Sequence, residues 1–556
     1  MSLDQWVPGV AAVRSYRRRW LRADIVSGLV LAAILVPQGM AYAELAGLPA
    51  VTGLYTTIAC LVAYAVFGPS RVLVLGPDSS VSPLILAAIT PLLVVDDPGR
   101  AIVLAGMLAL LVGLIEIGLG VARLGFVADL LSSEVQVGYM NGLAITIVIS
   151  QLPKLFGFST DADGSLDELR AFFEHLDATQ AGAVLVGAGV LVVLLVLPRI
   201  ARRVPAVLVA VAGATIVSAL LDLAADGVAT VGTLPQGFPK PALPWTSLDD
   251  VGPLLLAAIG IVLVSLTDTI ATASSFAARR GDELQPNQEM IGIGTANVAA
   301  GFFQGFAIST SGSRTAVAEQ SGAKTQLTGV VGAGLVAILL LFLNSLLSDL
   351  PQSALAGVVI AAALSLANVA ALRQYARVRI SSLLLSLVAT LGVVALGVLQ
   401  GIVVAIFLAI LLFFRRNWWP HGAVLGLTAD SEGWHSLDEL PGAQELPGIV
   451  VYRWEAPLFF ANAGAFRQQI RRLVRDRSPR WIVLQCEAVT DIDVTAAEML
   501  EQLDTELNAA GIHVAFVELR SRLRDLVGRY GLYETLDREH FYSTLDAALA
   551  AIADES

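Results

Sequence analysis

The residues of this chain that are most able to do chemistry are charged side chains set inside long apolar runs. Arg314 ends a run of small and hydroxyl-bearing residues that begins at Ser309. A guanidinium near the centre of a bilayer costs about 2.5 to 3.5 kcal/mol on insertion scales, so it needs an anionic partner or water. The hydroxyl groups of Ser79, Ser311 and Ser313 would supply further hydrogen-bond donors. This combination predicts a binding site for a small anion.

Asp268 is the second costly residue, and it lies in the apolar run 254–276. Thr272 follows it by one helical turn, so the carboxylate and a hydroxyl share one face of a helix. Two roles fit: the carboxylate carries a proton, or it binds Na+ together with Thr272 and with backbone oxygens near Thr310 and Gly312. A structural role is the alternative, either as a neutral group hydrogen-bonded between helices or as a constant partner of Arg314.

Two interrupted segments are the elements that must position these residues. Each is a Ser- and Gly-rich extended piece, at 75–82 and at 306–315, that leads into an apolar segment too short to cross the ~30 Å membrane core. If both short segments are half-helices that begin near mid-membrane, their N-termini aim free N–H groups and partial positive charge at one point. Such a pair indicates a substrate site between inverted repeats. The alternative is that the small residues only let helices pack closely.

Composition places most of the chain in a membrane. Of its 556 residues, 56% are hydrophobic and only 15% are charged, whereas charged residues make up about a quarter of a soluble domain. Apolar stretches recur from about 24 to 414 and leave room for roughly 12 to 14 spans. Glu116, in one of these stretches, is interpreted as a packing or cytoplasm-facing residue without a function. From about 423 onward the chain is mixed polar and apolar, which predicts a separate soluble domain.

Arginine clusters predict the orientation. They lie at Arg14, Arg17, Arg18, Arg19 and Arg22; at Arg199, Arg202 and Arg203; at Arg279 and Arg280; at Arg373, Arg377 and Arg379; and at Arg415 and Arg416. Counted as fourteen spans with the third and tenth short, every cluster falls on the side of the N-terminus, which the positive-inside rule makes cytoplasmic. The C-terminal domain is then cytoplasmic as well, in a protein of the inner (plasma) membrane. The net charge of −12 argues against a nucleic-acid partner.

Several functions are excluded. Cys60 and Cys486 are the only cysteines, so no disulfide framework is expected. No histidine lies inside an apolar run, which removes the usual ligand of a buried redox metal. The chain has no G-x-x-x-x-G-K-[ST] loop, which excludes a Walker-type ATP-driven pump, and its first 20 residues lack the features of a cleavable signal peptide. We expect no enzyme, no cofactor and no metal site apart from the Na+ considered at Asp268 and Thr272.

Short motifs along nearly the whole chain together resemble the sulfate permease (SulP) family of bacterial, plant and animal anion transporters. They are VPQGMAYA at 36–43, FGPSR at 67–71 followed by Gly76 and Pro77, LGFVADL at 124–130 with Gly138 and Tyr139, NQEM at 287–290 with Gly294 and Asn297, and SGSRT at 311–315. The resemblance implies two inverted seven-span repeats, divided into a core domain with the site and a gate domain. It also implies elevator-like alternating access and a homodimer in membrane lipid.

By the same resemblance, the anion lies between the N-termini of spans 3 and 10 and beside span 1. The residues that match these positions are Gln38, Tyr42, Pro77, Asp78, Ser79, Ser80, Ser311, Gly312, Ser313 and Arg314. Asp268 matches the acidic residue of span 8. Relatives with Glu there are associated with proton coupling, and bicarbonate-transporting cyanobacterial members have Asp there for Na+. Asp78 departs from the family pattern because it adds a negative charge next to the anion site.

The tail 446–555 alternates strand-like and helix-like segments, which predicts a small α/β domain with its strands between helices. It resembles the STAS domain, a fold shared with anti-sigma factor antagonists. Thr495 stands where those antagonists carry a phosphorylated Ser or Thr before a helix, a position that favours phosphate electrostatically. Thr495 is equally explained as a plain N-cap beside Asp493. A cytoplasmic protein partner is expected for this domain.

The predicted function is secondary active transport of a small inorganic anion, sulfate or bicarbonate first, by symport with H+ or Na+. The alternatives are a C4-dicarboxylate such as fumarate, and an anion exchanger or channel. A membrane-tethered signalling protein would not need Arg314, Asp268 or two half-helices. The expected domains are a cytoplasmic segment 1–23, a transmembrane domain 24–416, a linker 417–445 and a STAS domain 446–556.

Overall fold

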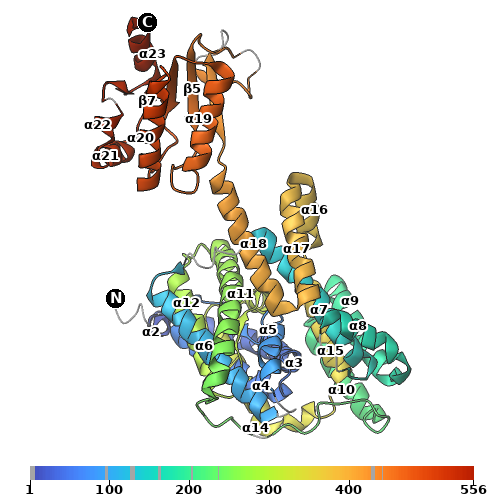
Figure 1. Ribbon diagram of the computed structural model, residues 1–556. Helices are drawn as coiled ribbons and strands as arrows, with labels where there is room; N and C mark the ends of the chain where they lie inside the picture. The colour runs from blue at the N-terminus through green and yellow to red at the C-terminus, as the bar shows by residue number, and fades with distance from the viewer. Residues whose placement is uncertain are drawn as a thin grey trace. The chain divides into compact units, whose positions relative to one another are not determined.

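The computed structural model describes residues 7–93, 98–125, 132–160, 164–201, 204–235, 237–427, 433–440, 443–536 and 538–555. It divides into two compact units, Met1–Ala409 and Ile410–Ser556, each with its own hydrophobic core (Figure 1). The predicted motif at 124–130 lies outside the described residues from position 126 onward.

The first half of the helical unit runs from α2 to α10. Its helices are α2 (Pro8–Arg14), α3 (Leu21–Leu45), α4 (Ala50–Phe67), α5 (Ser82–Ile89), α6 (Pro98–Val121), α7 (Ser133–Phe156), α8 (Ser165–Glu174), α9 (Ala181–Ile200) and α10 (Ala206–Leu221). A two-residue strand, β1 (Leu75–Gly76), precedes α5, and a 3-10 turn at Thr90–Leu92 extends it. The third predicted span is therefore a short helix behind an extended piece.

The second half repeats this order. Its helices are α11 (Leu248–Arg280), α12 (Pro286–Phe302), α13 (Gly312–Gln320), α14 (Leu327–Phe342), α15 (Gln352–Leu366), α16 (Val369–Val378), α17 (Ile380–Leu396) and α18 (Val398–Trp418), and β2 (Ser309–Thr310) precedes α13. The short helices α2, α8 and α16 bury one side chain or none. Without them, fourteen helices follow one another among the described residues, as the predicted fourteen-span membrane unit requires.

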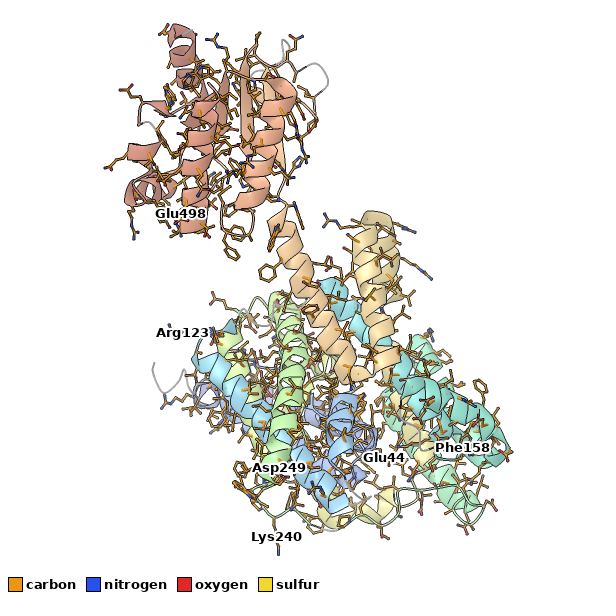
Figure 2. The ribbon with its side chains drawn as sticks, viewed as in Figure 1. Glu44, Arg123, Phe158, Lys240, Asp249 and Glu498 are labelled. Carbon is orange, nitrogen blue, oxygen red and sulfur yellow. The ribbon has the colours of Figure 1, made fainter. Side chains whose placement is uncertain are left out.

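Length and composition support a membrane location. Among the described residues, seven helices are long and apolar enough to cross a membrane, and four shorter apolar helices accompany them. The acidic first turn of α11 and its basic last turn lie at opposite ends of a 33-residue helix. Figure 2 shows Asp249 and Lys240 together at one end of the helical unit and Arg123 at the other.

Close contact between α6 and α12 organises the first unit. Glycines recur every seventh residue on α6, at Gly106, Gly113 and Gly120, and meet the backbone of α12. A Cβ on Gly113 would lie 2.5 Å from the carbonyl oxygen of Gly294. Only glycine permits this approach, in the way that small residues allow membrane helices to pack without large side chains between them.

The second unit is built on one six-stranded sheet of order β4-β3-β5-β6-β7-β8. The strands are β3 (Gly422–Leu427), β4 (Trp434–Ser436), β5 (Ile449–Trp454), β6 (Trp481–Gln485), β7 (His513–Val517) and β8 (Phe541–Tyr542). The helices are α19 (Ala463–Arg477), α20 (Val494–Ala509), α21 (Ser521–Arg529), α22 (Leu532–Thr535) and α23 (Leu545–Glu555). Pairing from β5 to β8 is parallel, and β3 is antiparallel to β4 and β5.

Helices cover both faces of this sheet, as predicted. Alternate residues of each strand enter different cores: Tyr452 packs with Phe466 of α19, whereas the neighbouring Val451 packs with Leu545 of α23. Such alternation follows from the two-residue period of a strand.

The segment 417–445, expected to be a linker, contributes two strands to the sheet. Leu425 of β3 pairs with Val451 of β5 on one side and with Ser436 of β4 on the other. Alternating burial along β3, with Ala423 and Leu425 inside, is a strand signal that the sequence interpretation missed. We propose that the C-terminal domain begins near Gly422 instead of at 446.

Candidate functional site

Two short strands bring the distant interrupted segments together. β1 and β2 pair antiparallel, with Leu75 opposite Thr310 and Gly76 opposite Ser309. The N–H of Ser311 also donates to the carbonyl of Val74 at 3.0 Å. Inside a membrane, non-helical backbone must satisfy its polar groups within the protein. This pairing does so, and it sets the starts of α5 and α13 next to each other.

Arg314 lies in the first turn of α13 and is buried completely. Its Nη2 donates to the carbonyl of Pro77 at 2.7 Å and lies 3.7 Å from Oδ2 of Asp78. Nε and Nη1 are also buried but have no hydrogen-bond partner among the described residues. Gly76 makes room for the guanidinium, since a Cβ there would lie 2.8 Å from Nη1. The carboxylate paired with Arg314 is thus Asp78, which differs from the alternative in which Asp268 is its constant partner.

Asp78 shapes the turn that starts α5. Its Oδ1 accepts hydrogen bonds from the N–H and the hydroxyl of Ser80, at 3.0 and 2.8 Å. Its backbone carbonyl accepts from the hydroxyl of Ser82 at 2.8 Å. The side chain keeps 11% exposure, unlike that of Arg314. Asp78, Ser79 and Ser80 are all buried residues, and Oδ2 of Asp78 accepts no hydrogen bond from the described residues.

The start of α13 is the exposed part of the site. Gly312 and Ser313 are exposed, whereas Ser311 is buried. Ser311 caps the helix, since its hydroxyl accepts from the N–H of Arg314 at 3.4 Å and lies 3.1 Å from the hydroxyl of Ser313. The N–H groups of the first helical residues have no partner inside the helix. These groups and the Ser313 hydroxyl are donors available to an anion.

Helix α3 adds two buried polar side chains beside this point. Tyr42 interacts with Ser79 and lies within electrostatic reach of Asp78 and Arg314. Gln38, one turn earlier, is buried, and its Oε1 has no hydrogen-bond partner among the described residues. The two residues expected beside the site from span 1 therefore lie on the helix that the resemblance implies, and Tyr42 adjoins the turn before α5.

Asp268 and Thr272 lie on α11 next to the same strands. Asp268 is partly exposed, and its Oδ2 accepts from the hydroxyl of Ser309 at 3.4 Å. Thr272 faces the start of α13, because a Cβ on Gly312 would lie 4.0 Å from its hydroxyl oxygen. Thr310 turns elsewhere: its hydroxyl is fully buried and contacts that of Thr269 at 3.4 Å. The predicted coupling set is thus brought together except for the Thr310 side chain.

Glu116 is a polar residue that the sequence interpretation underrated. It is fully buried, so it does not face the cytoplasm. Its carboxyl group accepts from Asn297 Nδ2 at 2.8 Å and from the Ser265 hydroxyl at 3.1 Å. Asn297 Oδ1 in turn accepts from the N–H of Ile308 at 2.8 Å. The network holds the strand that enters β2, and the signal for it was an acidic residue and an asparagine inside apolar helices.

Glu289 is a second buried carboxyl that was not singled out. It accepts hydrogen bonds from the hydroxyls of Tyr64, at 2.6 Å, and Ser70. It lines a cavity of about 400 Å³ that also contacts Arg71 and Arg280. Glu289 therefore anchors the loop that leads into β1. Its position in the NQEM motif was the available signal, but its partners lie more than 200 residues away along the chain.

In the C-terminal unit, Asp493 rather than Thr495 is the N-cap of α20. The carboxylate of Asp493 accepts from the N–H of Ala496 and from that of Phe460, both at 2.8 Å. Thr495 is exposed in the first turn. The alternative in which Thr495 is the cap is therefore wrong, because the cap position belongs to the residue before the helix.

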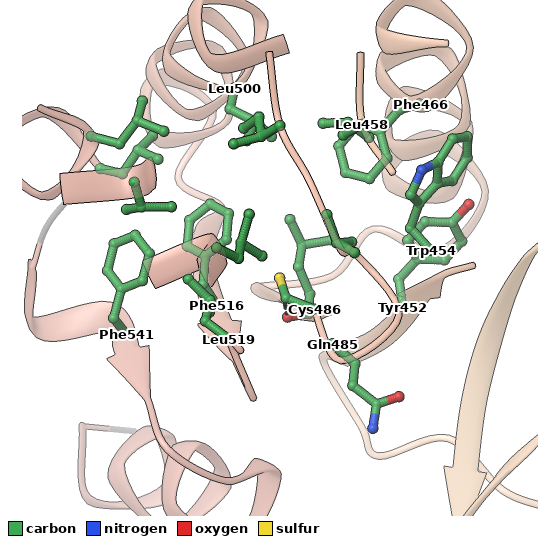
Figure 3. A pocket seen from close by; sticks show the side chains of 17 residues that line it. Tyr452, Trp454, Leu458, Phe466, Gln485, Cys486, Leu500, Phe516, Leu519 and Phe541 are labelled. Atoms are coloured by element: carbon green, nitrogen blue, oxygen red, sulfur yellow. Dashed lines mark hydrogen bonds between the residues drawn. The ribbon is translucent and has the colours of Figure 1, made fainter. Parts of the chain in front are cut away.

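A small cavity of about 40 Å³ lies in the core of this unit, lined almost wholly by apolar side chains (Figure 3). Trp454, Phe466 and Phe516 surround it together with Cys486. Burial raises the pKa of the Cys486 thiol to about 12, so the group is an unreactive thiol. We interpret the cavity as a packing void in the hydrophobic core and not as a functional site.

Known proteins resemble this chain along its whole length. The sequence model of the sulfate permease family matches residues 21–389, and that of the STAS domain matches 441–548. A "Probable sulfate transporter" of Mycobacterium tuberculosis is 42% identical over 99% of both chains. "Probable sulfate transporter 4.2" of Arabidopsis thaliana is 30% identical over 97% of this chain and 82% of its own.

Solved structures share the fold. The overall structure of SLC26A9 matches with a TM-score of 0.92 at 22% identity and covers 100% of this chain and 93% of its own. The transmembrane domain of the cyanobacterial bicarbonate transporter BicA matches with a TM-score of 0.62 at 24% identity and covers 71% of this chain and 98% of its own. The predicted fold, a helical membrane unit with a C-terminal STAS domain, is confirmed.

Proposed function

Because this chain belongs to the sulfate permease family, a family of transporters and not of enzymes, we propose that it is a secondary active transporter of a small inorganic anion, sulfate or bicarbonate first. The observation that carries the proposal is the state of Arg314. Its Nε and Nη1 are buried, with no hydrogen-bond partner among the described residues, at the point where two short helices begin. A buried charge with unpaired donors costs free energy, so an anion bound close by, at the exposed start of α13, would be stabilised by the charge of the guanidinium.

The anion would bind at the exposed start of α13. It would meet free backbone N–H groups of Gly312 and Ser313, as anions do at helix N-termini. The buried positive charge of Arg314, in the first turn of the same helix, would attract the anion, and this attraction is strong because the surroundings have a low dielectric constant. Backbone amides and one guanidinium accept several oxyanions alike. These groups therefore support a small anion as the ligand, but they do not favour one particular anion.

Asp268 and Thr272 would bind the coupling ion, H+ or Na+. Both lie on α11 beside the proposed anion position, and Asp268 interacts electrostatically with Asp78. When no cation is bound to the Asp268 carboxylate, its negative charge repels an arriving anion. A bound H+ or Na+ removes that repulsion. Each ligand therefore raises the affinity for the other, which is the thermodynamic requirement for coupling.

The packing of the helices supports two inverted repeats and an elevator-type movement. The contact of α6 with α12 has a counterpart in that of α14 with α4, and the contact of α7 with α17 has one in that of α15 with α9. If each helix is replaced by its counterpart in the other half of the unit, the first contact of each pair becomes the second. We assign α3–α6 and α11–α14 to a core, and α7, α9, α10, α15, α17 and α18 to a gate. Helix α3 contacts both α10 and α15, which supports a sliding surface along this helix.

We further propose an inner-membrane homodimer with both termini in the cytoplasm, following the distribution of arginine. The STAS domain would bind a cytoplasmic protein, with Thr495 exposed for phosphorylation. Asp493 at the same helix start would oppose the phosphate by like-charge repulsion. If mass spectrometry finds no phosphate on Thr495 of the cellular protein under any growth condition, this regulatory role is removed.

A C4-dicarboxylate such as fumarate is the alternative substrate, and exchange or channel conduction is the alternative mode. Uptake into proteoliposomes tests all of these together. Radiolabelled sulfate, bicarbonate and fumarate are supplied in parallel under a pH gradient and, separately, under a Na+ gradient. Accumulation of one anion against its own gradient identifies substrate and coupling ion. Uptake that only equilibrates, or that needs a counter-anion inside, would replace symport by a channel or an exchanger.

A further inference from the structure

Asp78 is an unusual group to find beside an anion site. Its Oδ1 is occupied by the two hydrogen bonds from Ser80. Its Oδ2 accepts no hydrogen bond from the described residues and lies 3.7 Å from Arg314 Nη2, beyond hydrogen-bond distance. Asp78 is a buried residue whose side chain keeps 11% exposure, whereas that of Arg314 keeps none. The site therefore offers a bound anion several donors and, at Asp78, one open acceptor.

An ionised carboxylate can only accept hydrogen bonds. An anion without hydrogen, such as nitrate or sulfate, likewise only accepts, so next to Oδ2 it meets repulsion with no compensating bond. An oxyanion that keeps a hydroxyl group, such as hydrogencarbonate, can donate that hydrogen to Oδ2. Its remaining oxygens can still accept from Ser313 and the first N–H groups of α13.

We propose that Asp78 is a specificity residue that selects oxyanions bearing an O–H group over oxyanions that bear none. The inference rests on the proposed function, because it assumes that the transported anion binds between the starts of α5 and α13. It narrows the substrate class to oxyanions that bear at least one O–H group, of which hydrogencarbonate is an example.

The rejection of a hydrogen-free anion arises from both sides of the contact. A site built to hydrogen-bond a hydroxyl discriminates strongly against an analogue that lacks it, because the polar group of the site is then left unpaired. Hydrogen bonds to charged groups contribute enough for about a tenfold to hundredfold preference. Arg314 does not remove the effect between two singly charged anions, since its charge attracts both equally.

The test compares two anions that differ in little but the hydrogen. Hydrogencarbonate and nitrate are both planar, both singly charged and similar in size. Their dissociation constants for the purified full-length protein are measured at one pH and one ionic strength, by competition against a labelled anion that the wild-type protein transports. We expect the wild type to prefer hydrogencarbonate by about tenfold or more. In Asp78→Asn, whose amide can donate to nitrate, the preference should fall to near unity.

Two further variants keep the result interpretable. Glu116→Gln makes the same carboxyl-to-amide change at a fully buried position hydrogen-bonded to Ser265 and Asn297, and it should keep the wild-type ratio. Arg314→Ala should weaken the binding of both anions. The melting temperature of each variant reports whether it is folded.

A wild type that binds the two anions equally, or a folded Asp78→Asn that keeps the wild-type ratio, overturns the proposal for Asp78. If the Asp78 carboxyl of the wild type were protonated and donated a hydrogen bond to the anion, Asp78→Asn would donate in the same way and would keep the wild-type ratio. Neither outcome argues against the proposed anion site as long as Arg314→Ala binds anions more weakly than the wild type. If Arg314→Ala binds anions with wild-type affinity, the proposed anion site beside Arg314 is wrong.

Discussion

At the scale of single residues, the site depends on which polar atoms are satisfied and which are not. Ser80 and Asp78 bond to each other, and Ser311 caps α13. Arg314 is left with donors that no described residue fills. Because unfilled buried donors are rare in folded proteins, this residue separates a binding site from a merely close-packed crossing of small residues.

Asp268→Asn tests the coupling residue. The amide keeps the size and the contact with Ser309 but binds neither H+ nor Na+ in the same way, so a driving gradient should no longer concentrate the anion. Coupling of this kind changes affinity by about 5- to 150-fold, and a loss in that range is expected for cation-stimulated anion binding. Binding and gradient-driven accumulation are measured on the same proteoliposome preparation. Wild-type accumulation with unaltered dependence on pH and Na+ would make Asp268 structural.

At the scale of elements, the two interrupted segments and their meeting at one point could be predicted, but the individual contacts between them could not. Ser- and Gly-rich extended pieces before short apolar runs indicated α5 and α13, because a break in an apolar run is a local signal. The pairing of Gly76 with Ser309 joins segments more than 200 residues apart. The contacts of Asp78 with Arg314 and of Glu289 with Tyr64 depend on that long-range assembly. One sequence carries no direct signal for either contact.

The α6–α12 crossing offers a test of element packing. Gly113→Ala adds a Cβ that would lie 2.5 Å from the carbonyl of Gly294, so the helices must separate. Overpacking of this kind costs about 1 to 3 kcal/mol, and the melting temperature in detergent should fall. Anion affinity should weaken too, since Glu116 and Asn297 hold the strand into β2 across the same crossing.

Gly118→Ala is the matched control on the same helix. Apart from the backbone of its own helix, no atom of the described residues lies within 4 Å of a Cβ at Gly118. The melting temperature should therefore stay at or above that of the wild type, because alanine favours a helix. Equal loss of stability in both variants would show that the close approach at Gly113 is not what the crossing depends on.

At the scale of the whole molecule, each unit buries its own core. The soluble domain was predictable because its strands and helices alternate with clear periods, and the predicted strand 481–485 agrees with β6. The strands β3 and β4 were not predicted, because β4 is only three residues long and β3 stands apart from the alternating pattern that begins at 446.

Removal of the chain from Pro420 onward tests the independence of the membrane unit. The anion contacts that we propose all lie within Met1–Ala409, so we expect the shortened protein to fold and to bind anion with wild-type affinity. Transport rate and dimer mass are then compared with those of the full chain. Loss of anion affinity in a folded, shortened protein would mean that the STAS domain takes part in the site itself.

The central claim is that an anion binds where α5 and α13 begin, with Arg314 supplying the charge. Its most direct test is anion binding to purified wild type, Arg314→Ala and Arg314→Lys, measured by calorimetry with sulfate, hydrogencarbonate and fumarate at low salt, with a melting curve for each protein. The account predicts that Arg314→Ala stays folded and loses measurable affinity for every anion that the wild type binds, while Arg314→Lys keeps part of it. A folded Arg314→Ala protein with wild-type affinities would contradict the account.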